Sequence, residues 1–275
     1  MKAKLRLGIA APSGAGKTYS ALLMAFGLGG KIGLIDTEHG SGHLYAHLGD
    51  YAVISIDAPY TVAKYIQAVK AFEEAGYTTI IIDSLSHAWA GDGGLLDKQG
   101  KLADRGTNSF AAWRTITPEH NNLVDAMLRS PCHIIATMRA KQDYVLEVND
   151  KGKQTPKKVG MAPVQREGME YEFTVMLDVD MNHIASASKD RTSLFDGRFF
   201  KISHETGKEL LAWLEMGEAG PDVDAIIKSI ANAGDLKILR GHHDAAISML
   251  PSHHHQQIKD AANKRREELV QKEPA

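Results

Sequence analysis

A glycine-rich segment near the start of the chain contains residue types that bind phosphate groups. It matches the pattern G-x-x-x-x-G-K-[ST] except at its first position, where an alanine stands. Gly14 and Gly16 let the backbone curl until its N–H groups face an anion, and the N-terminus of a following helix adds positive potential. A chance glycine-rich turn before a helix is the alternative. The segment predicts a nucleotide site made of Ala11, Pro12, Ser13, Gly14, Ala15, Gly16, Lys17 and Thr18.

Two residues of this phosphate loop and a distant carboxylate suggest how a nucleotide and a metal ion are held. Lys17 is placed to reach the β- and γ-phosphates, and Thr18 to bind Mg²⁺. Asp83 directly follows the apolar segment Thr79–Ile82 and is suited to orienting Mg²⁺ through its water shell. A strand that simply ends at a capping aspartate is the alternative for Asp83. The sequence therefore predicts an ATP site with Mg²⁺ at Thr18 and Asp83.

A second acidic segment offers a catalytic carboxylate. Glu38 lies just beyond the apolar segment Ile32–Ile35. Ligands of doubly wound sheets bind at the carboxyl ends of the strands, so Glu38 is a candidate for polarising the water that attacks a γ-phosphate. The alternative is that Asp36 and Glu38 are two solvated acids in a loop.

Short apolar segments that alternate with helical patterns must position these residues. This alternation is typical of crossover units with a parallel sheet, and nearly all-apolar strands indicate a sheet covered on both faces. The predicted fold class is α/β, with a mainly parallel sheet flanked by helices. The expected strands are Leu5–Ala10, Ile32–Ile35, Ala52–Ile56, Thr79–Ile82 and His133–Thr137, and the expected helices follow Lys17 and occupy Thr61–Ala75 and Ile116–Arg129.

The pattern changes after the fifth strand. Tyr144–Val148 leads through a turn signal, Asn-Asp-Lys-Gly, into Lys153–Val159, which predicts a protruding hairpin. Gly91–Asn108 is a glycine-rich stretch that we expect to form a loop. Late strands are expected at Phe173–Asp180, His183–Ser188 and Arg198–Lys201.

A small helical module is predicted at the end of the chain. Residues 217–221 contain two glycines and a proline and read as a linker. Three helices are expected after it, at Val223–Ala231, Leu236–Met249 and Ser252–Val270. The predicted domains are a core at 1–216, the linker at 217–221 and the module at 222–275. The module's charges are balanced, which favours protein docking or stabilisation over a DNA clamp.

Composition limits the class of protein. The chain has 275 residues and a net charge of −2, so any nucleic-acid binding must come from a local patch. A single cysteine, Cys132, excludes an internal disulfide and a cysteine-based zinc site. No apolar run approaches the roughly 20 residues of a membrane span, and no signal peptide is recognisable. We expect a cytoplasmic protein without a membrane partner.

The acidic segment also carries a family resemblance. Asp36-Thr37-Glu38-His39, with Tyr45 seven residues beyond Glu38, resembles the RecA family, in which the corresponding strand ends in Asp-Ala-Glu-His with a tyrosine at that spacing. The order of elements and the Asp-Ser pair after the fourth strand agree as well. The resemblance spans about Leu5 to Lys201, and the chain length and helical tail are similar to the RecA-like ATPases that phages carry near recombination and single-strand-annealing genes.

The resemblance implies roles for particular residues and an assembly. Glu38 corresponds to the catalytic glutamate and Tyr45 to the residue that stacks on adenine. Thr137 and Arg139 stand where the family has a polar γ-phosphate sensor, here without the family's glutamine. Lys189 and Arg191 correspond to a basic pair offered across a subunit interface in a ring or filament, although a solvated turn is the alternative.

A basic stretch around the predicted hairpin is the candidate nucleic-acid site. Between Arg139 and Gly168 there are seven Lys or Arg residues against four Asp or Glu residues. The position resembles the second DNA-binding loop of RecA, and such loops neutralise backbone phosphates. Hydrated surface loops are the alternative. The predicted nucleic-acid contacts are Lys151, Lys153, Lys157, Lys158 and Arg166.

These features together predict a Mg²⁺-dependent, RecA-like ATPase. We expect it to bind single-stranded DNA in phage recombination or replication and to hydrolyse ATP at subunit interfaces, in the cytoplasm of a bacterial host. A ring-shaped helicase or translocase is the alternative among enzymes. A nucleotide-gated scaffold, which recruits a recombination or replication protein through its C-terminal helices, is the alternative without DNA binding.

Overall fold

The computed structural model describes residues 3–106, 108–148, 154–216, 223–250 and 254–272, and for 109, 142–148, 154–160, 271 and 272 it describes the backbone alone. The chain divides into two compact units, one spanning Lys4–Leu214 and one that contains Glu215–Ala275. The linker predicted at 217–221 lies outside the described residues.

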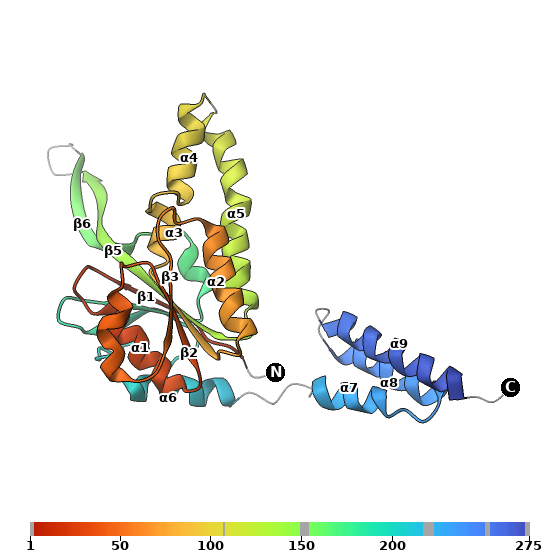
Figure 1. Ribbon diagram of the computed structural model, residues 1–275. Helices are drawn as coiled ribbons and strands as arrows, with labels where there is room; N and C mark the ends of the chain where they lie inside the picture. Colours follow the sequence, from red (N-terminus) through yellow and green to blue (C-terminus); the bar gives the residue numbers. More distant parts are fainter. Residues whose placement is uncertain (1–2, 107, 149–153, 217–222, 251–253, 273–275) are drawn as a thin grey trace. The chain divides into compact units, whose positions relative to one another are not determined.

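The larger unit is built on a mostly parallel sheet with helices on both faces (Figure 1). Its first five strands and β7 run parallel to one another, whereas β8 runs antiparallel to β7. The α/β prediction is thereby confirmed. The spatial order is β3 (Ala52–Ser55), β2 (Ile32–Asp36), β4 (Thr79–Asp83), β5 (His133–Val148), β1 (Arg6–Ala11), β7 (Val175–Val179) and β8 (Ala185–Asp190).

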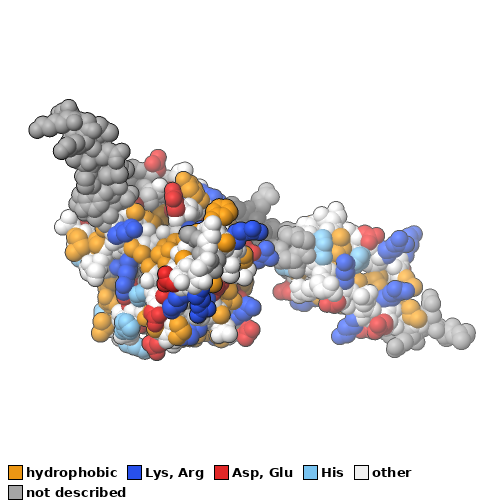
Figure 2. Space-filling model, turned by 90° about the horizontal axis from the view of Figure 1, so that it is seen from above, with side chains coloured by type: hydrophobic (Ala, Val, Ile, Leu, Met, Phe, Trp, Pro, Cys, Tyr) orange, Lys and Arg blue, Asp and Glu red, His pale blue; other side chains and the backbone are white. Residues whose placement is uncertain are grey.

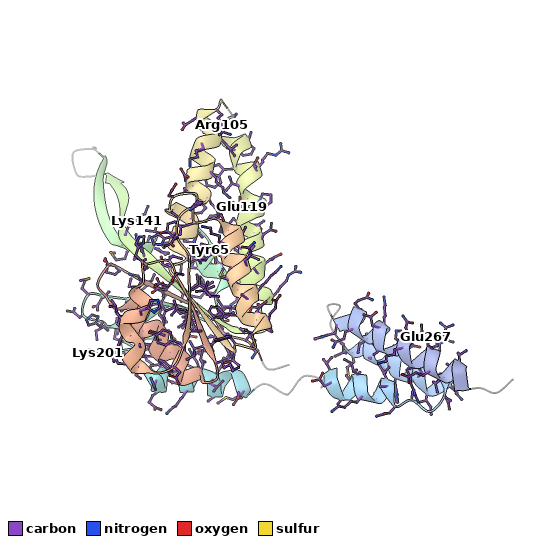
Figure 3. All side chains as sticks on the ribbon, in the orientation of Figure 1. Tyr65, Arg105, Glu119, Lys141, Lys201 and Glu267 are labelled. Atoms are coloured by element: carbon purple, nitrogen blue, oxygen red, sulfur yellow. The ribbon has the colours of Figure 1, made fainter. Side chains whose placement is uncertain are left out.

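Successive residues of the central strands supply two apolar layers, one on each face of the sheet. Leu7 and Ile9 of β1 pack in the layer that includes α1 (Lys17–Leu28) and α6 (His204–Glu215). Ile80 and Ile82 of β4 pack in the opposite layer with α2 (Val62–Glu74), α3 (Ser86–Ala90) and α5 (Ser109–Arg129). Tyr65 of α2 lies fully buried in this second layer (Figure 3). The covered faces explain why these strands are apolar throughout.

The loop prediction for Gly91–Asn108 is wrong, because this segment contains helix α4 (Leu95–Asp104). α4 packs against α5, to which Lys98 is joined by an ion pair with Glu119. Figures 1 and 3 show the two helices extending together beyond the sheet, with Arg105 at the end of α4. α5 also begins earlier than predicted, since the Asn108 side chain caps it by accepting a hydrogen bond from the Phe110 N–H at 2.8 Å.

The predicted hairpin is present in the backbone. β5 continues past the sheet and pairs antiparallel with β6 (Gln154–Pro163). Lys141 lies near its base (Figure 3). The late strand expected at Arg198–Lys201 is wrong, because among the described residues this segment makes only an isolated bridge between Phe200 and Ala185. Two short 3-10 helices complete the unit, η1 (Ser41–Leu48) and η2 (Met169–Glu172).

The smaller unit consists of three helices, α7 (Val223–Ala231), α8 (Leu236–Met249) and α9 (His255–Lys272). They share a small apolar core that includes Ile230, Leu239 and Ile258. Asp235 caps α8 by accepting a hydrogen bond from the Ile238 N–H at 2.7 Å. The third helix was expected from Ser252 and begins at His255, while 251–253 lie outside the described residues. No helix in the described part of the chain is long and apolar enough to cross a membrane.

Candidate nucleotide-binding site

A pocket of about 590 Å³ lies at the carboxyl edge of the parallel strands. It brings together residues from the phosphate loop, from the segments after β2 and β4, and from the base of the β5–β6 hairpin. Its walls are Ser13, Gly14, Gly16, Lys17, Thr18, Glu38, Ser41, Tyr45, Asp83, Arg139, Ala140 and Val164. Chain segments more than 100 residues apart thus meet where a doubly wound sheet binds its ligands.

The phosphate loop has the backbone shape that its glycines permit. Gly14 and Gly16 have φ values of 81° and 84°, in the left-handed region that side chains disfavour. A Cβ atom at Gly14 would meet nothing within 4 Å, so conformation rather than space requires glycine there. Ala11 and Ala15, at the start and in the middle of the loop, are both buried, so the alanine at the first position of the pattern has little exposure to solvent.

Lys17 bridges the loop from within the pocket. Its ammonium donates to the carbonyls of Ala11 at 3.3 Å and Pro12 at 3.1 Å. Burial lowers the pKa of Lys17, whereas the charges of Asp83 and Glu38 oppose that effect. A partly desolvated cation held over a curled backbone is suited to bind a phosphate anion.

Asp83 is the most deeply buried acid of the site, with 1% of its surface exposed. Its Oδ2 accepts a hydrogen bond from the Thr18 hydroxyl, and its Oδ1 accepts one from the Thr137 hydroxyl at 2.5 Å. Burial raises the pKa of Asp83, and these two hydrogen bonds act against the rise. Thr137 is buried and does not line the pocket, so its contact with the site is the hydrogen bond that it donates to the Asp83 carboxylate.

The Thr18 and Asp83 oxygens fit Mg²⁺. Both are hard donors, and magnesium in nucleotide sites is bound by one or two protein oxygens together with substrate phosphates. Among the described residues, no group of three or more His, Cys, Asp or Glu side chains is arranged to hold a metal by itself. An ion at this place would thus need oxygens from a bound nucleotide.

Glu38 is held by an arginine that the structure places beside it. Arg139 donates through Nε to Oε1 at 3.0 Å and through Nη2 to Oε2 at 2.5 Å, and Ser84 donates to Oε1 at 3.1 Å. Burial raises the pKa of Glu38, but the hydrogen bonds and charge of Arg139 outweigh it, so the pKa is lowered overall. Glu38 is therefore an ionised carboxylate whose two oxygens are both engaged.

Asp36 shapes the turn after β2, a role that the sequence patterns did not indicate. Asp36, 2% exposed, accepts hydrogen bonds from the N–H groups of Glu38 at 2.7 Å and Gly42 at 3.0 Å. Asp36 thus fixes the direction in which Glu38 leaves the strand. Its position directly after the apolar run is the one sequence signal that could have indicated this role.

Two serines and two histidines of the site were also missed. Ser86 accepts from the Arg139 backbone N–H at 2.9 Å, and Ser84 contacts Glu38 as described. His87 shares a hydrogen bond of 2.7 Å with Thr37. His183 approaches the phosphate loop from β7–β8, with 3.1 Å between its Nδ1 and the Ala15 carbonyl oxygen. These contacts join distant segments and left no signal in local patterns.

Tyr45 lines the pocket from η1, as expected of a residue that contacts a base. Its ring makes an edge contact with Tyr19 of α1, at 5.8 Å between centroids and 63° between planes. Tyr19 is 40% exposed. Two aromatic rings thus stand at the rim beside the phosphate loop, where a flat base could stack.

Lys189 and Arg191 lie elsewhere. Lys189 of β8 is in register, through β7, with Gly8 toward the amino end of β1, whereas the phosphate loop follows the carboxyl end. Lys189 donates to the carbonyls of Glu170 at 3.2 Å and Tyr171, and Arg191 donates to the Tyr171 carbonyl at 3.3 Å. Neither side chain lines the pocket of its own chain.

The predicted nucleic-acid residues are only partly described. Lys151 and Lys153 lie outside the described residues. Lys157 and Lys158 belong to β6 and pair through their backbones with Val145 and Tyr144. Arg166 packs on α5 instead, with its guanidinium 5.9 Å from the Trp113 ring centre and 3.3 Å from the Thr117 hydroxyl.

The geometry agrees with a comparison of the sequence with protein families. No curated protein sequence matches the chain. Residues 3–207, well over half of the chain, match the AAA domain, which indicates a nucleotide-dependent ATPase with a phosphate loop. The matched range includes the phosphate loop, Glu38, Asp83 and Arg139 and ends before the three-helix unit. On this match and this pocket, the chain belongs to the AAA domain family.

Proposed function

We propose that this protein is a RecA-like ATPase that binds single-stranded DNA, hydrolyses ATP at subunit interfaces and acts in phage recombination or replication. One observation carries the proposal. The pocket that contains Lys17, Asp83 and Glu38 is also lined by Ala140 and Val164, which stand at the base of the β5–β6 hairpin. A bound nucleotide would therefore touch the root of the basic hairpin.

Different residues of the pocket act on the phosphates, the metal ion and the attacking water. Backbone N–H groups of the loop and the Lys17 ammonium bind the phosphates. Mg²⁺ at Thr18 and Asp83 would neutralise charge on the terminal phosphates. Glu38 accepts a proton from the attacking water, which requires that one carboxylate oxygen leave Arg139 or Ser84. A γ-phosphate competes with Glu38 for the Arg139 guanidinium, because both are anions within the same pocket.

The hairpin supplies the DNA contact in this proposal. Its second strand contains Lys157 and Lys158, and Lys151 and Lys153 lie between the two strands in the sequence, outside the described residues. Lysines on a protruding hairpin neutralise backbone phosphates without reading sequence. The backbone of Arg139 is joined to the return strand by the Val164 N–H, which donates to the Arg139 carbonyl at 2.6 Å. The residue whose guanidinium faces the pocket is thus also bonded, through its backbone, to the root of the hairpin.

Assembly explains the basic pair that lies far from its own pocket. Lys189 and Arg191 occupy the opposite end of the sheet from the phosphate loop, so they could serve only the pocket of a neighbouring subunit. A cation from a neighbour stabilises charge on the departing phosphate and makes hydrolysis depend on assembly.

ATP hydrolysis tests the pocket directly. Lys17→Ala and Glu38→Gln should each lower kcat by at least about 100-fold, since each removes a group that acts in the transition state. Lys70→Ala, an exposed lysine of α2 outside the pocket, is the matched control and should keep full activity. Unchanged hydrolysis in both pocket variants would mean that the site is assigned wrongly.

DNA binding is tested by fluorescence anisotropy with a labelled single-stranded oligonucleotide, with and without ATP. The double variant Lys157→Glu, Lys158→Glu should weaken binding and reduce its salt dependence, because phosphate contacts are lost. Lys70→Glu is the control for the change in charge. Absence of binding by the unaltered protein at low salt would contradict the DNA proposal and favour a scaffold.

Mixing two inactive variants tests the action across an interface. Lys17→Ala subunits have a defective pocket and an intact basic pair, and Arg191→Ala subunits have the reverse. Mixtures should regain part of the ATPase activity, since some interfaces combine two intact halves. If no mixing ratio restores activity, the basic pair does not act in trans.

A further inference from the structure

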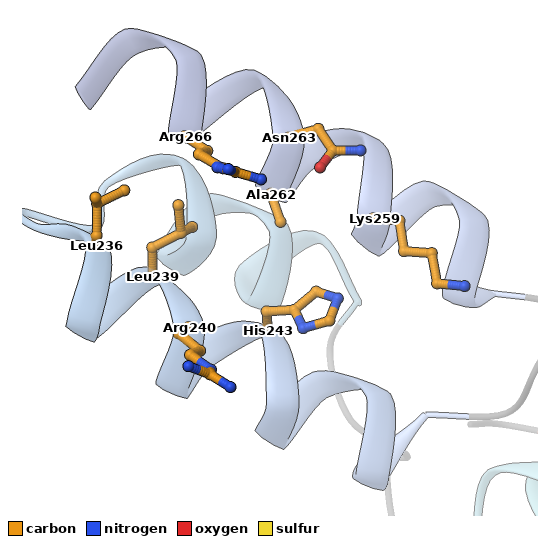
Figure 4. A pocket seen from close by; sticks show the side chains of 8 residues that line it. All are labelled: Leu236, Leu239, Arg240, His243, Lys259, Ala262, Asn263 and Arg266. Atoms are coloured by element: carbon orange, nitrogen blue, oxygen red, sulfur yellow. The ribbon is translucent and has the colours of Figure 1, made fainter. Parts of the chain in front are cut away.

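A groove between α8 and α9 of the three-helix unit carries three cations and no carboxylate (Figure 4). Its volume is about 510 Å³. On each helix the lining residues recur at spacings of three, four and seven, so each helix contributes one stripe. The stripes are Leu236, Leu239, Arg240 and His243 on α8, and Lys259, Ala262, Asn263 and Arg266 on α9.

The middle of the groove is apolar and continuous with the core of the unit. Leu239 and Ala262 are 5% and 9% exposed and belong to the three-helix core. Leu236, at the end of the groove near Arg266, is 44% exposed (Figure 4). A leucine that projects beside an apolar floor gains by being covered, at about 25 cal/mol for each Å² removed from water.

The cations on the rim are not used by the fold. Among the described residues, Lys259 and Arg266 form no ion pair, and Arg240 is 3.9 Å from the exposed carboxylate of Asp244. The neighbouring Arg265 differs, since it pairs with Glu268 at 2.7 Å and donates to the Ala233 carbonyl. Exposed pairs as distant as that of Arg240 contribute little. The groove thus presents available positive charge.

We propose that this groove binds a short acidic segment of a partner protein that carries an apolar side chain between two carboxylates. Lys259 and Arg266 are seven residues apart on α9, a separation of about 10 Å along the helix. In an extended peptide every second side chain lies on the same face, so carboxylates four positions apart face the same way at about 13 Å, with one further side chain between them on that face. Two carboxylates four positions apart therefore lie within reach of the long Lys259 and Arg266 side chains, while the side chain midway between them rests on Leu239 and Ala262.

Features of the groove favour a peptide over nucleic acid. None of its lining residues has a phenyl, phenol or indole ring on which bases could stack, and Asn263 and His243 offer hydrogen bonds that a peptide backbone can meet. Three acidic residues directly follow lining residues in the sequence, namely Asp244, Asp260 and Glu267, and Figure 2 shows acidic among basic side chains on the visible face of this unit. A continuous polyanion would meet these charges, whereas a short acidic segment would not.

The test uses the full chain and a fluorescein-labelled peptide with Asp-Ser-Leu-Ser-Asp at its centre, in which both carboxylates and the leucine share one face of an extended peptide. Arg266→Glu and Lys259→Glu should each weaken binding about tenfold, because an attraction becomes a repulsion. Lys264→Glu makes the same change on the same helix outside the groove and should alter affinity by less than about twofold. Arg266→Gln and Lys259→Gln serve where a charge reversal alters the circular dichroism spectrum.

Three results would overturn the proposal. The first is the absence of peptide binding at about 1 mM in low salt. The second is equal binding by unaltered protein and the Arg266 and Lys259 variants, or equal binding of a Ser-Ser-Leu-Ser-Ser peptide. The third is a loss of single-stranded oligonucleotide affinity in Arg266→Glu without any peptide binding, which would make the groove a nucleic-acid site. ATP hydrolysis is not part of the readout, so failure of the proposed ATPase would leave this result unaffected.

Discussion

Replacing Arg139 by glutamine should change the pH dependence of ATP hydrolysis in a direction that the structure fixes. Arg139 holds both oxygens of Glu38, at 2.5 Å and 3.0 Å, and lowers the pKa of that carboxyl against the effect of burial. Without the guanidinium, burial prevails and the pKa of Glu38 rises. Glu38 then becomes protonated, and inactive as a base, at a higher pH than in the unaltered protein.

The magnitude follows from the exposure of the pair. The side chains of Arg139 and Glu38 are 47% and 21% exposed, so solvent screens the interaction and limits it to about 1 kcal/mol. A change of about 1 kcal/mol in the ionisation of Glu38 corresponds to about a fivefold fall in kcat/KM on the acidic limb of the profile. Loss of a contact between Arg139 and the γ-phosphate would lower kcat/KM at every pH instead.

The assay is the pH profile of kcat/KM for the variant and the unaltered protein, each divided by its own plateau. This division removes any loss that is uniform with pH and leaves the change in ionisation. Arg129→Gln is the matched control, because Arg129 is 82% exposed and, within the described part of the chain, forms an ion pair with Asp125 alone, at 3.5 Å. An acidic limb that superimposes on that of the unaltered protein, or that moves to lower pH, would refute the role given to the Arg139–Glu38 pair.

Stability measurements offer further predictions. Gly27→Ala should lower the free energy of unfolding by about 1–3 kcal/mol, because its Cβ would lie 2.2 Å from the His204 carbonyl oxygen. Gly100→Ala should raise the free energy of unfolding by about 0.5–1 kcal/mol, because Gly100 lies within helix α4 and its Cβ would meet nothing within 4 Å. Urea titrations that give both variants the same sign would contradict the packing of α1 on α6. Thr137→Val should cost about 1.5–3 kcal/mol at neutral pH, since the buried Asp83 loses a donor. Burial raises the pKa of Asp83, so the ionised carboxylate is the form that most needs the lost hydrogen bond. The difference in unfolding free energy between the variant and the unaltered protein should therefore shrink as pH falls and the carboxyl becomes protonated. A difference that grows in acid would exclude this explanation.

Local sequence patterns were sufficient for the elements that are defined by their own residues. The strand before the phosphate loop, the glycines at positive φ and the helix after Lys17 are encoded within a short segment. The same holds for the pairing of β5 with β6 and for the break between α7 and α8. Periodicity, turn residues and caps act over a few residues, so they can be read without knowing the partners of each element.

Where those patterns were ambiguous, packing decided the outcome. The glycines of Gly91–Asn108 suggested a loop, but α4 forms there because α5 offers it a surface and Lys98 an ion-pair partner in Glu119. Arg198–Lys201 was expected to form a strand, but in the described structure Phe200 makes only an isolated bridge, with Ala185. Helix and strand propensities are weak next to such tertiary contacts.

The amino-acid sequence by itself determined the chemistry available to this protein: a phosphate loop, a buried aspartate at the end of a strand and a glutamate at the end of another. Only the tertiary structure decided how those groups are used. It paired Glu38 with Arg139 across 101 positions of sequence, set Lys189 and Arg191 away from their own pocket, and aligned two helix stripes into a basic groove. The physical reason is that side-chain type is a local property, whereas pairing, burial and the resulting pKa depend on segments that meet only when the sheet and the helices have packed.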